Sequence, residues 1–86
     1  MALPQTTDFP VGKDWTLILA GPTTSGVYAE VGANPLLYRI ETALPTSAFG
    51  HRLDADTHGE PITLLAGESL YAKGVDCETT IILTGE

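Results

Sequence analysis

Apolar and polar residues alternate along several short stretches of this chain. Val27, Ala29 and Val31 alternate with Tyr28 and Glu30. Successive side chains of a β-strand point to opposite faces, so this period of two predicts a strand with one buried face. Stretches of this kind, rich in branched and aromatic residues, occur at residues 15–20, 27–31, 36–42, 51–53, 62–65, 69–73 and 79–84.

The spacing of these stretches predicts the fold class. They recur roughly every 10 residues, and segments rich in Gly, Pro and Thr separate them. None of them has the length of an ordinary helix. We therefore predict an all-β protein, a small antiparallel β-sandwich or barrel of about seven strands.

The first 14 residues differ from the rest of the chain. They contain Pro4 and Pro10, which cannot donate hydrogen bonds to a sheet, and they show no clear alternation. We predict that residues 1–14 form an extended arm and that residues 15–86 form a single β domain. The arm would contact a larger neighbouring protein through Leu3, Phe9 and Val11.

Several predicted strands are apolar on both faces. A chain of 86 residues buries only about 60% of its unfolded surface. Large residues on the second faces therefore exceed what one small core can hold, and a second copy of the chain would cover them. The alternative is a sandwich that hides some of them and leaves the others singly exposed. The residues predicted to form an interface between copies are Ile18, Leu37, Leu65 and Ile82.

Charge and cysteine content exclude several classes of partner. Four basic and eleven acidic residues give a net charge of −7, so we expect no nucleic acid partner and no binding to an anionic membrane surface. The apolar stretches are too short for a membrane span, and no signal peptide is recognised. The single cysteine, Cys77, cannot form an internal disulfide, so stability must come from packing.

No set of residues has the spacing of a known catalytic or metal site. His51 and His58 lack a zinc-ligand pattern, and Cys77 lies between two acidic residues that disfavour a thiolate. Residues 54–60 begin like a calcium-binding loop but lack its second half. They are either a solvated acidic loop or a weak cation site. We expect no enzymatic activity and no cofactor.

Two tyrosines leave open a different role. Tyr28 and Tyr71 fall out of phase with their apolar neighbours, which predicts that both rings are exposed. Exposed aromatic rings near carboxylates suit sugars. A host-glycan binding module is therefore the alternative to a structural role.

Residues 27–84 carry a succession of strands and turns that includes the segment GEPITLLAGESLYAK at 59–73. This succession resembles the small all-β structural proteins of tailed bacteriophages. The resemblance implies a component of the virion, either a capsid decoration or cement protein or an accessory of the tail or its fibres. It also implies a larger capsid or tail protein as partner and a homo-oligomer, for which we expect a trimer.

Overall fold

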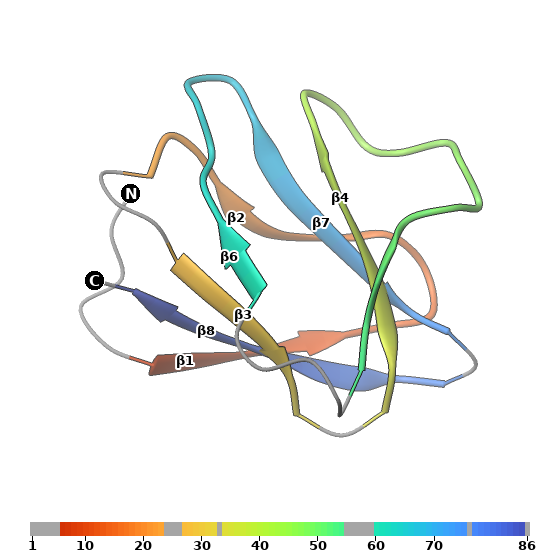
Figure 1. Ribbon diagram of the computed structural model, residues 1–86. Coiled ribbons are helices and arrows are strands. Elements are labelled where there is room, and N and C mark those ends of the chain that lie inside the picture. Colours follow the sequence, from red (N-terminus) through yellow and green to blue (C-terminus); the bar gives the residue numbers. More distant parts are fainter. Residues whose placement is uncertain (1–5, 24–26, 33, 55–59, 76, 86) are drawn as a thin grey trace.

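The computed structural model describes residues 6–23, 27–32, 34–54, 60–75 and 77–85. They form a small all-β fold, which confirms the predicted fold class (Figure 1). These described residues form eight strands, one more than the seven stretches recognised in the sequence. The strands are β1 (Thr6–Val11), β2 (Thr16–Ala20), β3 (Val27–Val31), β4 (Leu36–Glu41), β5 (His51–Leu53), β6 (Glu60–Ile62), β7 (Ser69–Gly74) and β8 (Thr79–Gly85).

The strands form two antiparallel sheets of four. The first sheet has the order β1-β8-β3-β6 and the second has the order β2-β7-β4-β5. Four pairs of strands are nested, so that each pair encloses the next in the sequence. They are β1 with β8, β2 with β7, β3 with β6, and β4 with β5. Rolling up one long hairpin brings β3 beside β8 and β4 beside β7. Eight strands in this order form a jelly-roll sandwich.

The hydrophobic core lies between the two sheets. Strands β3 and β8 of the first sheet and β4 and β7 of the second supply most of it, in the alternating pattern that the sequence predicts. Its largest fully buried side chains are Leu36, Leu53, Leu64, Leu70, Ile81, Leu83, Val11 and Val27. The described residues include no helix that could span a membrane.

The predicted separation of an extended arm at residues 1–14 from the β domain is wrong for residues 6–11, because they form β1 and pair with β8. Val11 is only 1% exposed, and Phe9 packs against the core. Pro10 is compatible with this strand because β1 lies at the edge of its sheet, where a missing N–H leaves no ladder partner unsatisfied. Leu3 lies outside the described residues.

A β-bulge in β2 corrects the predicted orientation of Ile18. Leu17 pairs with Tyr71 and Leu19 pairs with the adjacent Leu70, so Ile18 is an extra residue. Such an insertion shifts the alternation by one position. Ile18 and Leu19 are therefore both buried, whereas Leu17 is 55% exposed. The outward apolar residue of β2 is Leu17.

All four edge strands have features that oppose pairing with another chain. Strand β1 contains Pro10, and β6 has only three residues, one of them Pro61. Strand β2 contains the bulge, and β5 also has only three residues. Short edges, prolines and bulges are the usual protection against edge-to-edge aggregation. Extension of either sheet along a complete edge strand is therefore disfavoured.

Candidate functional site

The outer face of the first sheet is polar and acidic. Its residues alternate with the buried positions of β1, β3 and β8. Asp8 and Glu30 both pair with Ile82, one from each side of β8. The Thr6 and Thr84 hydroxyl oxygens are 3.1 Å apart. Among the described residues, this face has no basic side chain to offset its two carboxylates.

The outer face of the second sheet carries aromatic and basic side chains. Leu17, Tyr71 and Arg39 form one row across β2, β7 and β4. In the neighbouring row, Lys73 pairs with Leu37, which pairs on its other side with Arg52. Three of the four basic residues in the chain therefore belong to this face.

The connection between β4 and β5, residues 42–50, packs on this face. The Trp15 Nε1–H donates a hydrogen bond to the Ser47 carbonyl oxygen at 2.8 Å. The Arg39 Nη1 group donates to the Phe49 carbonyl oxygen at 3.0 Å. A Cβ on Gly50 would lie 2.9 Å from the Trp15 ring and 3.2 Å from the Leu37 Cβ. The chain thus covers part of its own outer face.

Trp15 connects this cover to the sheet. The Lys73 Nζ lies 5.2 Å from the centroid of the Trp15 ring, within the range of a cation–π interaction. The indole therefore meets a cation from β7 and a carbonyl of the 42–50 connection. This arrangement accounts for the partial burial of Trp15 and Leu37.

Among the described residues of the second sheet and its cover, three large apolar side chains are more than half exposed. Leu17 is 55% exposed, Leu44 is 62% exposed and Phe49 is 79% exposed. Leu17 lies on β2, and the other two belong to the 42–50 connection. We call these three residues the apolar surface of the second sheet.

The four residues predicted to form an interface do not lie on one face. Ile18 is a core residue, only 8% exposed. Leu37 is half-buried on the second sheet, and Ile82 is half-buried between two carboxylates on the first. Leu65 is 67% exposed in the β6–β7 connection. The exposure of Leu17, Leu44 and Phe49 is not predictable from the sequence, because it depends on the bulge and on the path of the 42–50 connection.

The two tyrosines do not form a common sugar-binding platform. Tyr28 is 44% exposed on the first sheet, as predicted. Tyr71 is only 9% exposed, so its predicted exposure is wrong. It lies on the second sheet between Leu17 and Arg39, which flank it on both neighbouring strands.

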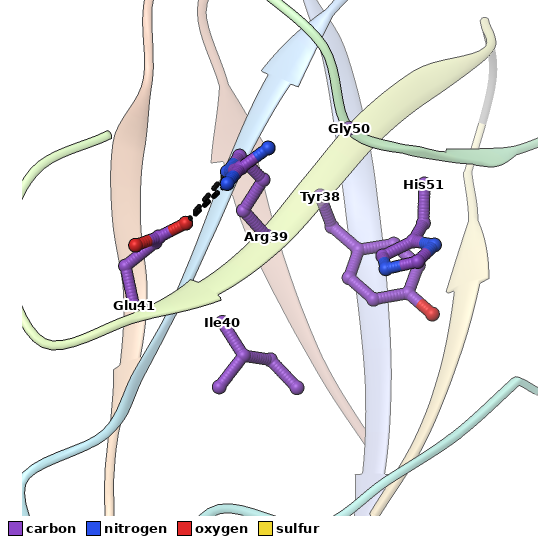
Figure 2. A pocket seen from close by; sticks show the side chains of 6 residues that line it. All are labelled: Tyr38, Arg39, Ile40, Glu41, Gly50 and His51. Atoms are coloured by element: carbon purple, nitrogen blue, oxygen red, sulfur yellow. Dashed lines mark hydrogen bonds and ion pairs between the residues drawn. The ribbon is translucent and has the colours of Figure 1, made fainter. Parts of the chain in front are cut away.

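A pocket of about 320 Å³ lies beside β4, where β5 begins (Figure 2). The rings of Tyr38 and His51 pack against each other on one side, with centroids 5.2 Å apart and planes tilted by 37°. On the other side, the Arg39 Nη2 is 2.6 Å from the Glu41 Oε2, and the Arg39 Nε donates to the same oxygen at 2.7 Å. The residues lining the pocket are Tyr38, Arg39, Ile40, Glu41, Gly50 and His51.

The pocket exists because β5 is shorter than β4. Strand β5 pairs with β4 only from Leu36 to Tyr38, whereas β7 pairs with β4 as far as Glu41. Residues 39–41 therefore have a strand on one side only, among the described residues. We call this segment the open β4 edge. The sequence gives little sign of it, because the relative lengths of paired strands depend on the turn between them.

Those candidate residues for metal and acid–base chemistry that the structure describes do not assemble into a site. The part of the chain that the structure describes holds no group of three His, Cys, Asp or Glu residues suited to a metal ion. His51 packs on Tyr38, and Cys77 is exposed. The Asp54 carboxylate accepts a hydrogen bond from the Arg52 Nε at 3.4 Å. Of the candidate cation segment at 54–60, residues 55–59, including His58, lie outside the described residues.

Comparisons of this chain with models of known protein families, with curated proteins and with solved structures found no match. The class of protein is therefore given by its topology alone, that of a jelly-roll β-sandwich.

Proposed function

We propose that this protein is a non-enzymatic structural subunit of a tailed bacteriophage particle. It acts as a capsid decoration or cement protein or as a tail accessory, and it associates with itself and with a larger capsid or tail protein. A homotrimer is the assembly we propose. The jelly-roll topology supports this role, since viral capsid proteins use the same arrangement of strands. Topology alone does not define a function, so the surface must carry the argument.

The observation that carries the proposal is the apolar surface of the second sheet. Leu17, Leu44 and Phe49 are each more than half exposed. Exposed apolar side chains that form a contiguous patch are typical of association surfaces, and the proposal requires these three to act as one patch. The hydrophobic gain is about 25 cal/mol for each Å² removed from water, so burial of three such side chains between copies contributes several kcal/mol per interface.

The edge strands support association through faces rather than through edges. Prolines in β1 and β6, the bulge in β2 and the short β5 oppose the growth of a continuous sheet between copies. Contact through the outer face of a sheet buries side chains and leaves the hydrogen bonds between the strands intact. Such contacts can close into a ring of copies, and a trimer is a small closed ring.

Light scattering after size exclusion tests the proposal. We expect the wild-type protein to elute as a homotrimer and the double substitution Leu17→Glu with Phe49→Ser to elute as a monomer that remains folded. Leu65→Ser is the matched control, because Leu65 is equally exposed but lies in the β6–β7 connection. A wild-type protein that stays monomeric at high concentration would contradict the proposal, as would an equal effect of the control.

A further inference from the structure

The open β4 edge differs from the four edge strands of the sandwich. Each of those strands has a proline, a bulge or a length of only three residues. Residues 39–41 have none of these features, since they continue a regular six-residue strand with unbroken register to β7. Three residues at about 3.3 Å each give roughly 10 Å of strand whose second side has no partner strand among the described residues.

The walls beside this edge have different chemistry on its two sides (Figure 2). Tyr38 and Ile40 point to one side, where Ile40 is 37% exposed and the exposed His51 stacks on Tyr38. Arg39 and Glu41 point to the other side, where they form an ion pair. An apolar wall and a charged wall therefore flank a segment of backbone that lacks a strand on one side.

We propose that the open β4 edge is a docking site for an extended peptide segment of a partner protein. The segment adds as a short strand in line with β5 and forms main-chain hydrogen bonds with β4. One apolar side chain of the segment contacts Ile40 and the exposed His51 ring, and its two neighbours are polar and lie beside the Arg39–Glu41 pair. This site goes beyond the proposed self-association and does not depend on it.

Two observations favour a peptide over a sugar. Tyr38 is only 7% exposed, so its ring offers no open face on which a sugar could stack. The pocket of about 320 Å³ is at the small end of ligand sites, yet it lies along a strand edge, where a peptide backbone finds matched donors and acceptors.

The test is a selection of short random linear peptides displayed on their encoding RNA, with the full chain as the target. Enriched peptides are synthesised, and their affinities are measured by fluorescence anisotropy. We expect alternating polar and apolar sequences whose affinity falls about tenfold in the Ile40→Lys variant, as when one buried contact is lost. Leu65→Lys is the matched control and should bind normally. His51→Ala should weaken binding as well, and because His51 is exposed, this variant stays informative if Ile40→Lys does not fold.

Two further measurements separate strand addition from other modes of binding. Amide resonances of residues 39–41 should shift on titration with an enriched peptide. N-methylation of alternate peptide residues should abolish binding, and methylation of the residues between them should not. The proposal is overturned if no peptide is enriched, if binding is equal in Ile40→Lys and wild type, or if a glycan array gives ligands that compete for the same residues. Light scattering on the same samples reports self-association separately.

Discussion

The outer faces of the two sheets contrast in composition and in cover. The first sheet shows solvent a face of threonines with Tyr28, Asp8, Glu30 and Ile82, and no segment of the described chain is hydrogen-bonded across it. The second sheet carries Trp15, Leu37 and Tyr71, and the 42–50 connection packs on part of it. Both faces come from strands with the same period of two. The composition of the outward positions therefore decides whether a face can remain open to water.

The contrast also shows how a small chain accommodates more apolar side chains than one core can hold. Trp15 and Leu37 are covered by the 42–50 connection, which has its own exposed residues, Leu44 and Phe49. The 42–50 connection thus shields apolar side chains of the sheet from water but exposes apolar side chains of its own. The second sheet is for this reason the face on which we place self-association.

The largest effect should come from removing the side chain that holds the cover. We expect Trp15→Ala to lower the free energy of unfolding by about 3 kcal/mol, since the half-buried indole packs on Gly50, donates to Ser47 and lies under Lys73. Urea unfolding measures this change. Trp15→Phe keeps most of the apolar area but loses the donor, so it should cost about 1 kcal/mol. A loss below that of Trp15→Phe would show that the cover contributes no stability.

A smaller effect should follow from lifting the cover without changing the sheet. In Gly50→Ala the new Cβ would meet the Trp15 ring at 2.9 Å and the Tyr38 carbonyl oxygen at 3.0 Å. We expect a loss of about 1 to 2 kcal/mol in unfolding free energy, together with increased solvent quenching of the Trp15 fluorescence.

Gly12→Ala is the matched control for this substitution, because its Cβ would meet nothing closer than 4.0 Å. It should change the free energy of unfolding by less than about 0.5 kcal/mol. Equal losses in the two variants would mean that glycine flexibility, and not close packing, determines the result at Gly50.

The smallest effect should come from the open face of the first sheet. Asp8 and Glu30 flank Ile82 and are separated by two strand spacings, or about 10 Å. We expect Glu30→Gln to raise the unfolding free energy by no more than about 0.5 kcal/mol and to do so mainly at low salt, since exposed charges at this distance are strongly screened.

Glu78→Gln controls for the change in net charge, because Glu78 is exposed in the turn between β7 and β8. Comparison of the two variants in thermal melts at low and high salt separates the repulsion between Glu30 and Asp8 from the effect of the change in net charge. A destabilisation of more than about 1 kcal/mol by Glu30→Gln would show that this face is not a simple solvated surface.

The sequence predicts the fold class and most of the strands, because alternation is a local property. Strands β3, β4 and β8 follow their patterns closely. Strand β1 is hidden by Pro10 and by its polar inward residue Thr7, since edge position and pairing with β8 depend on the whole fold. The bulge at Ile18 is invisible for the same reason, because it exists only relative to β7.

The candidate sites depend even more on tertiary structure. The neighbours of Tyr71 in the sequence indicate that its side chain lies on the outer face of the sheet. Its burial depends on Leu17 and Arg39, which lie beside it on other strands. The pocket beside Ile40 requires β5 to end earlier than β4, and a weak three-residue stretch in the sequence does not specify where pairing stops.

The nested pairing of the strands has a consequence for biosynthesis. Among these nested pairs of described strands, only β4 and β5 follow each other directly in the chain. In each of the other pairs, at least two strands lie between the partners in the sequence. The entropy cost of loop closure is lowest for the innermost pair, β4 and β5. The other pairings join residues far apart in the sequence, which makes folding slow for a chain of this size. During translation, β1 must wait for β8 to emerge from the ribosome, so this edge strand has no partner while the strands between them are synthesised.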